Sequence, residues 1–541
     1  MKKINLLVLI LVCLISGSVF AIKLNPTAPQ GGVMNYNLPA EPESIHPIMS
    51  TDTYEQWIAE YAHDTLCAVN LDTYKQEPRL AEKWEISKNG LEFTFFLRKN
   101  AFFHNGEPIT ADDVKFSLDT IREPKHQALH IIPYIETFKK IEVIDKNTIK
   151  FYASEKYFKN LEVLCSLKAI PKSVYSNIDK SVKMQRELVG AGPYKLEKYD
   201  KGQIMTFKKF DKWYGSALPE FKGYFNLDQI NFRFTKEDTV SIEKFKKGDL
   251  DFQNDPTVDA YLKAEKNLGA NAKAYKVITS KPKSYGFIGF NFQNEILKEL
   301  STRQALAHLV NRAEMNTKFR NGMSHLATGP VSVNSVQAAD VKAIEFSPKK
   351  AQEILKKAGW ADSDKDGILD RTINGQMQKM SFTLIYPSKD PEKYWTMFKQ
   401  DAQKSGVEIV LKYMEWNSFI KTIESKNMEM WAMAWGAGSV EMDPKQIWHS
   451  SSAATGGSNR GTYANAEVDK LIDEGRAELD EKKRSVMFKK AYTLIAKDVP
   501  YIFLFNSKYD FYFSSNKMKK TVDTYKYDFG YSTWWTDAKS N

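Results

Sequence analysis

The chain has 541 residues, of which 42% are hydrophobic, and its formal net charge is +10. This length exceeds what one compact core supports, so we expect two or three subdomains. The basic excess is dispersed, and no block of Lys or Arg of the kind that binds nucleic acid occurs, so we predict no nucleic-acid partner.

The first residues have the pattern of an export signal. Lys2 and Lys3 form a charged start, an apolar run follows, and Val19-Phe20-Ala21 places small residues at the −3 and −1 positions. We therefore predict a signal peptide over residues 1–21, cleaved after Ala21; an uncleaved anchor is the alternative. Cys13 lies inside the apolar run with no small residue before it, so lipidation is not expected. No later segment is long and apolar enough to cross a membrane, so we expect a soluble mature protein.

Cys67 and Cys165 are the only cysteines after the predicted signal. In an exported protein they could form one disulfide, and two free core thiols are an equal alternative. The chain has no CxxC motif and no Cys/His cluster, which argues against zinc or redox chemistry. We predict no cofactor.

The first half of the chain alternates predicted strands and helices. Val33 to Leu38 alternates like a strand, and Thr53 to Val69 has apolar residues near helical spacing. Further on, residues 239–247 predict a helix closed by Gly248, and a strand begins within Asp249 to Phe252. Such alternation indicates an α/β sheet.

The stretch from Leu80 to Ile121 has the strongest local pattern. Trp84 to Ile86 and Leu91 to Leu97 predict a hairpin, because the Asn-Gly pair between them suits a tight turn. After a second turn, Thr110 is the expected N-cap of a helix, with Asp113 three residues later to complete a capping box.

Two continuous apolar strands, Tyr285 to Phe292 and Tyr501 to Phe505, lie far apart in the sequence. Between them Met428 to Trp435 is a third apolar run fit for a buried strand, and it breaks at Gly436 and Gly438 into a polar loop. A strand that delivers an aromatic ring, small residues and acids to its carboxyl end is how an α/β domain builds a ligand crevice. An ordinary strand with a solvated loop is the alternative.

The segment DSDKDGILD has the spacing of a calcium loop. Asp362, Asp364, Asp366 and Asp370 stand at the expected positions, but Ile373 replaces the bidentate Glu at position twelve. A turn follows where a helix is expected. We favour a solvated loop and keep a weak structural calcium site as the alternative.

Motifs for catalysis are missing from the chain. It has no GxxxxGK[ST], HExxH or GxSxG segment, and Glu441 and Asp443 have no activated nucleophile or base specified nearby. We favour charge recognition by these acids over catalysis and predict that the protein is not an enzyme, with no catalytic residues.

Five blocks resemble, in the same order, the extracellular solute-binding proteins that feed oligopeptide and dipeptide ABC importers. A further segment, Leu218 to Phe252, most resembles the Yej-type branch of that group. The five blocks span nearly the whole mature chain, which makes the resemblance far more specific than one motif. They are LAEKWEIS…GLEFTFFLRKNAFFHNGEPITADDVKFSL, GAGPYKLEKYDKGQIMTFKKFDKWYG, FNFQNEILKELSTRQALAHLVNR, SPKKAQEILKKAG and NAEVDKLI.

The resemblance implies a two-lobed α/β periplasmic-binding-protein fold of type II, in the large peptide-binding class, with an extra subdomain and an interlobe cleft. The two distant apolar strands would lie side by side at the crossings between lobes, which would close over ligand by hinge motion. We expect lobe I in residues 22–49, 183–284 and 508–541, its subdomain in 50–182, and lobe II in 285–507.

The implied function is that of a periplasmic protein that captures oligopeptides or peptide-like compounds and delivers them to an ABC importer. Its partners would be the peptide and the permease subunits at the inner membrane, and we expect a monomer. The alternatives are the same fold with an oligosaccharide or a metal chelate as cargo, or a secreted hydrolase that uses Glu441 or Asp443.

Site residues follow from the same resemblance, which implies that two tryptophans line the pocket, although a buried core role is the alternative for each. Many members hold the peptide amino group with an aspartate three residues beyond the second tryptophan, where this chain has glycine. Either one of the two later acids takes that role, or the ligand is not held by its amino terminus. The loop's asparagine and arginine could bind ligand carboxylate or backbone, with a structural ion pair as the alternative for the arginine. The predicted ligand-binding residues are Trp416, Trp435, Gly436, Gly438, Ser439, Glu441, Asp443, Asn459 and Arg460.

Overall fold

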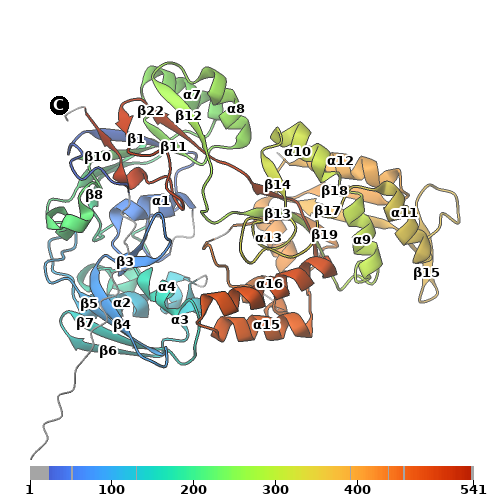
Figure 1. Ribbon diagram of the computed structural model, residues 1–541, viewed down its shortest axis with the longest axis horizontal. Coiled ribbons are helices and arrows are strands. Elements are labelled where there is room, and N and C mark those ends of the chain that lie inside the picture. Colours follow the sequence, from blue (N-terminus) through green and yellow to red (C-terminus); the bar gives the residue numbers. More distant parts are fainter. Residues whose placement is uncertain are drawn as a thin grey trace, which may run out of the picture.

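The computed structural model describes residues 23–49, 53–128, 131–389, 391–436, 438–454 and 457–537. The predicted signal peptide and its cleavage site lie outside these residues. The described chain forms two lobes, each built on its own sheet (Figure 1). None of its helices has the length and apolar character that a membrane span requires.

Lobe I is built on a seven-stranded sheet in the order β12-β22-β11-β1-β10-β9-β8. Strand β1 coincides with the predicted strand Val33–Leu38, and helix α7 ends at Gly248, which adopts a φ of 79° as the predicted C-cap. The elements of lobe I are β1 Val33–Leu38, β8 Tyr194–Asp200, β9 Ile204–Lys209, β10 Gln229–Phe234, α7 Asp238–Lys247, β11 Phe252–Asn254, α8 Val258–Asn267, β12 Ala272–Val277 and β22 Asp510–Ser515. Helix α1 Thr53–Ala62, which belongs to the subdomain, packs against β8.

The subdomain carries a four-stranded antiparallel sheet in the order β4-β5-β7-β6 and shares one hydrophobic core with lobe I. The predicted hairpin is confirmed in β4 and β5, and Gly90 in its turn has a φ of 72°. Thr110 is the N-cap of α2, and the Asp113 carboxylate accepts a hydrogen bond of 2.9 Å from the Thr110 amide. The elements are β4 Ala81–Ile86, β5 Glu92–Leu97, α2 Ala111–Ile121, α3 Ile132–Ile135, β6 Lys140–Asp145, β7 Thr148–Tyr152, α4 Asn160–Cys165, α5 Lys172–Tyr175 and α6 Ile178–Ser181.

Lobe II is built on a five-stranded sheet in the order β18-β17-β19-β13-β20, with helices on both faces. Side chains of β19 alternate between the two cores, with Met430 in one and Trp431 in the other, which explains its continuous apolar sequence. The elements are β13 Tyr285–Phe290, α9 Leu300–His308, α10 Arg312–Arg320, α11 Pro348–Lys357, β17 Ser381–Tyr386, α12 Glu392–Gln403, β18 Glu408–Tyr413, α13 Trp416–Glu424, β19 Met430–Trp435, α14 Lys445–Trp448, α15 Ala466–Ala477, α16 Glu481–Asp498 and β20 Tyr501–Phe503.

Four smaller strand pairs complete the fold: β2 Cys67–Val69 with β3 Gln76–Pro78, β14 Ser324–Leu326 with β21 Phe505–Ser507, β15 Asp370–Ile373 with β16 Gln376–Lys379, and β23 Met518–Lys519 with β24 Trp535–Thr536.

The two large sheets turn their carboxyl edges toward each other. In lobe I the parallel strands β1, β10 and β11 end at one edge, where β12 also ends and β22 begins. In lobe II the parallel strands β17, β18 and β19 end at one edge, where β13 begins and β20 ends. The two crossings, residues 278–284 and 508–509, join these edges (Figure 1). Open α/β sheets bind ligands outside the carboxyl ends of their strands, so this topology places a ligand crevice between the lobes.

The two distant apolar strands lie side by side, as predicted. Strand β13 pairs antiparallel with β20, and Phe287 is opposite Phe503. The first crossing also contacts the residues on either side of the second, since Asn506 donates a 3.1 Å hydrogen bond to the carbonyl of Ser284 and Lys283 forms an ion pair with Asp510.

The predicted helix from Thr53 to Val69 is wrong beyond Ala62, where α1 ends. Residues Cys67–Val69 instead form β2, paired antiparallel with β3, and a disulfide joins Cys67 to Cys165. This long-range pairing outweighs the local helical spacing of the apolar residues, and the disulfide fastens α4 to β2.

Candidate functional site

A cavity of about 610 Å³ lies between the subdomain and the loop that follows β19. Such a volume is typical of small-molecule sites in proteins. Gly436, Gly438, Ser439, Met442, Asp443, Gln446 and Ile447 form one wall at the carboxyl edge of the lobe II sheet. Helices α1 to α4 with the adjoining chain form the other. Four of the predicted site residues line it: Gly436, Gly438, Ser439 and Asp443.

The two glycines open the lobe II wall. A Cβ atom added at Gly436 or at Gly438 would meet no atom within 4 Å, and neither residue has a positive φ. A side chain would therefore fit at both positions, and its absence enlarges the cavity beside the end of β19.

The opposite wall was not predicted from the sequence. It combines aliphatic side chains with charged and polar ones, and its aliphatic members come mainly from helices whose sequence pattern indicates only core packing. Its apolar members include Ile48, Ile121, Ile131, Ile135, Val163 and Leu167.

The four charged groups of the subdomain wall are paired with one another. Lys168 binds Glu55 at 3.1 Å, and Lys159 binds Glu162 at 3.0 Å. Both pairs belong to the subdomain wall, and their carboxylates already accept ammonium hydrogen bonds.

Asp443 lines the cavity but is held by three hydrogen bonds. Its Oδ2 atom accepts from the Arg476 Nε atom and from the Tyr157 hydroxyl, each at 2.9 Å, and its Oδ1 atom accepts from the Lys445 amide at 3.0 Å. Only 9% of the Asp443 side chain is exposed. Its carboxylate is thus an anchor between Arg476 of α15 and Tyr157 of the subdomain.

Glu441 lies outside the cavity lining and forms a bidentate ion pair. Arg484 of α16 donates two hydrogen bonds of 2.7 Å to its two carboxylate oxygens, and Gln337 donates a third of 2.8 Å. A role of Glu441 in binding a ligand amino group stays a prediction, and these contacts occupy both of its oxygens.

The subdomain contacts lobe II through Tyr157 and Phe158, and we call this contact the seam. The centre of the Phe158 ring lies 5.6 Å from the centre of the Phe488 ring and 4.5 Å from the Arg484 guanidinium. The Phe158 amide donates a 3.0 Å hydrogen bond to the carbonyl of Arg476. In Figure 1 the helices α15 and α16 lie next to α3 and α4 at this seam. Sequence reasoning missed it, although two adjacent aromatics between lysines, outside any helix or strand pattern, are an unusual surface feature.

The two predicted tryptophans lie at the carboxyl edge of the lobe II sheet and do not line the cavity. Trp435 ends β19, and its ring stacks on Phe287 with ring centres 6.2 Å apart. Trp416 begins α13 just beyond β18; it is 53% exposed, and its ring lies 6.2 Å from that of Phe419. Trp435 packs against the core, and a role of the exposed Trp416 ring in ligand binding stays a prediction.

Asn459 and Arg460 lie at the other end of β19. Asn459 is buried and holds its own loop, donating to the carbonyl of Tyr463 at 2.8 Å. Arg460 pairs with Glu424 at 3.2 Å, and the next residue, Gly461, accepts a hydrogen bond from Phe292, just beyond the carboxyl end of β13. The structure does not bring these two residues together with the cavity.

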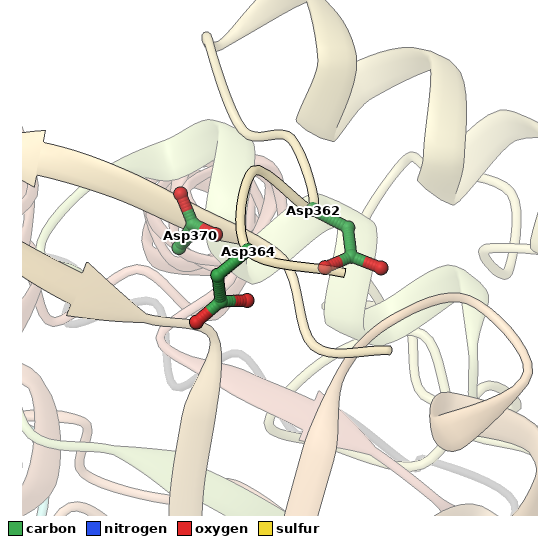
Figure 2. Close-up of side chains that lie close together, drawn as sticks. All are labelled: Asp362, Asp364 and Asp370. Carbon is green, nitrogen blue, oxygen red and sulfur yellow. The ribbon is translucent and has the colours of Figure 1, made fainter. Parts of the chain in front are cut away.

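The predicted calcium loop lies between α11 and β15, in a different part of lobe II. Ligand oxygens of Asp362, Asp364 and Asp370 lie within 4.8 Å of one another (Figure 2). The Lys379 ammonium binds Asp364 at 2.9 Å and also contacts Asp366, while Ser363 donates to Asp370. The lysine supplies a cation to this loop, and a calcium site here stays a prediction.

Comparisons with known proteins agree with this architecture. The model of the bacterial extracellular solute-binding proteins, family 5 Middle, matches residues 75–457. The chain is 27% identical over 529 residues to the oligopeptide-binding protein AppA of Bacillus subtilis, covering 94% of this chain and 92% of AppA.

Two solved structures share the fold. The structure of Bacillus subtilis AppA in complex with a nonapeptide has a TM-score of 0.77 and 26% identity, covering 94% of this chain and all (100%) of that one. NikA from Brucella suis in complex with Fe(III)-EDTA has a TM-score of 0.79, with coverage of 94% and 100%, but only 19% identity, so it supports the fold alone.

Proposed function

The chain belongs to the bacterial extracellular solute-binding proteins of family 5, and we propose that it captures oligopeptides between its lobes and delivers them to an ABC importer. The main support for a peptide as the ligand is the match over 94% of the chain to a relative whose structure holds a nonapeptide. The facing carboxyl edges of the two sheets, with a cavity beside one of them, support the same proposal.

Binding uses the crevice between the sheets and the cavity that adjoins it. An extended peptide takes hydrogen bonds from exposed backbone groups, which gives affinity without dependence on side chains. Gly436, Gly438 and Ser439 supply such backbone on the lobe II side, and the exposed ring of Trp416 lies at the same edge. Asp443 acts by joining the lobe II wall to the subdomain.

Closure over ligand occurs about the two crossings. They are the covalent links between lobe I and lobe II, and hinge motion of this kind needs changes in only a few residues. We assign lobe I to residues 22–49, 183–284 and 508–541, the subdomain to 50–182, and lobe II to 285–507.

The protein acts after export. The predicted cleavage after Ala21 releases it into the periplasm, where it works as a monomer and meets the permease subunits at the inner membrane. It binds its cargo without chemical turnover, because arginines pair with the carboxylates of both Glu441 and Asp443.

Mass spectrometry of the small molecules released from the purified, denatured protein tests the cargo directly. We expect a ladder of short peptides that reports length and sequence preference together. Release of a single sugar or chelate would show that the ligand is that compound and not a peptide. A protein that is empty and then binds no member of a peptide library would overturn the proposal.

A further inference from the structure

The cavity beside β19 has a specific chemical character. Aliphatic side chains from both walls face it, with Ile135, Val163 and Leu167 on the subdomain side and Met442 and Ile447 on the lobe II side. Burying an aliphatic side chain of a ligand among them is favourable by roughly 25 cal/mol for each Å² removed from water.

The charged groups in the same lining leave no counter-charge free for a ligand, among the residues that the structure describes. Glu55 pairs with Lys168, Lys159 pairs with Glu162, and Asp443 pairs with Arg476 outside the lining. Tyr134, the remaining titratable group, donates its hydroxyl hydrogen to Gln446 at 3.0 Å.

A charged ligand group would therefore lose its hydration in the cavity without gaining a partner. Such a burial is strongly unfavourable unless the charge is paired and hydrogen-bonded. An apolar group has no such cost. The cavity should therefore bind an apolar ligand group more tightly than a charged one.

We propose that this cavity is a side-chain subsite that takes a bulky apolar side chain of the bound peptide, and that it holds neither peptide terminus. The inference rests on the proposed function and names the ligand chemistry of that same site. It predicts that peptide affinity depends on one apolar side chain and is independent of a free amino terminus at this position.

The test uses the full-length mature protein and a defined peptide set in isothermal titration calorimetry. The peptides are alanine-based chains of different lengths that carry Leu, Lys or Glu at each position in turn, with free or acetylated amino termini. At one position we expect Leu to bind roughly tenfold to hundredfold more tightly than Lys or Glu. Acetylation should leave that preference unchanged.

Gly438→Asp sharpens the test, because a side chain at Gly438 meets no atom within 4 Å and the new carboxylate would face the cavity without a partner. We expect the preference for Leu over Lys at the sensitive position to fall roughly tenfold, while the preference for Leu over Glu does not fall. Gln376→Glu adds the same charge on an exposed hairpin of lobe II and is the matched control, expected to change neither ratio.

Circular dichroism melting of each variant establishes that it is folded before its affinities are compared. Equal binding of Leu, Lys and Glu peptides at every position of the wild type would overturn the subsite while leaving peptide capture intact. So would loss of binding on acetylation when the sensitive position is the first residue, because the amino terminus would then lie at the cavity. Failure of every peptide in the set to bind would instead overturn the proposed function.

Discussion

Two loops of lobe II are rich in acids, and their environments differ. In the loop after β19, Glu441 and Asp443 are paired with arginines from α15 and α16, and the Arg476 and Asp443 side chains are 19% and 9% exposed. In the loop before β15, Asp364 and Asp366 share Lys379, with all three side chains about 40% exposed.

The difference shows that the same sequence signal, closely spaced acids after a glycine or a turn, serves opposite energetic roles. The buried pair of Asp443 and Arg476 lies within lobe II, and Asp443 also accepts the hydrogen bond from Tyr157 that joins the subdomain to it. Removing one partner of the pair leaves a charge with little access to water. The exposed pairs at Lys379 are screened by solvent and contribute little. In both loops two of the acids, Glu441 with Asp443 and Asp364 with Asp366, are paired with cationic side chains. The motif alone therefore does not identify a ligand or metal site.

The largest effect is expected at Arg476. Arg476→Met leaves Asp443 buried with only its bonds to Tyr157 and to the Lys445 amide, so the free energy of unfolding should fall by about 3 kcal/mol. Urea unfolding followed by tryptophan fluorescence measures this. The double variant Arg476→Met/Asp443→Asn is the control, since removing both charges should recover part of the loss. An unchanged midpoint in the single variant would mean that solvent already reaches Asp443.

A smaller effect is expected from Phe158→Ala, which removes one of the two aromatic rings of the seam without removing a charge. Because the ring is partly exposed, unfolding free energy should fall by about 1–2 kcal/mol. The radius of gyration from solution X-ray scattering should increase without peptide, and peptide should reduce it. Val486→Ala is the matched control, because Val486 lies on α16, the helix that Phe158 contacts, and is 70% exposed. If peptide leaves the radius of gyration of the wild type unchanged, the proposed lobe closure does not occur.

The smallest effect is expected in the exposed loop. Lys379→Ala should shift the urea midpoint less than either variant above, because its partners are exposed and hydrated. For the wild type, thermal melting in calcium and in a chelator should coincide, since the Lys379 ammonium already pairs with Asp364 and Asp366. A calcium-dependent rise in the wild-type melting temperature would establish a metal site there. The acids of this loop would then bind a metal ion, unlike the arginine-paired acids of the loop after β19.

Local patterns predicted much of the fold because they rest on short-range geometry. The Asn-Gly turn fixed the β4–β5 hairpin, Thr110 with Asp113 fixed the start of α2, and Gly248 fixed the end of α7. The helix expected through Val69 failed because pairing of β2 with β3 and the bond between Cys67 and Cys165 connect residues distant in sequence.

The site was predicted only on its lobe II side. Gly436, Gly438, Ser439 and Asp443 line the cavity because a buried strand that breaks at glycines delivers its loop to the carboxyl edge. The wall from the subdomain escaped prediction, since residues such as Ile121 and Val163 have the periodicity of ordinary helical core. Asn459 and Arg460 lie far from the cavity because the chain returns to the opposite end of β19 before it reaches them. The order of residues alone does not reveal this return.

The sequence by itself determined the family, the predicted export, the buried strands and the turns that end them, since these depend on collinear blocks, hydrophobic periodicity and local backbone preferences. Only the tertiary structure decided which charges are free. Arg476 and Arg484 reach their acids from 33 and 43 residues further along the chain, and Tyr157 reaches Asp443 from another part of the molecule. Charge pairing depends on distance in space and on burial, so the chemistry of the cavity appears only when both of its walls are in place.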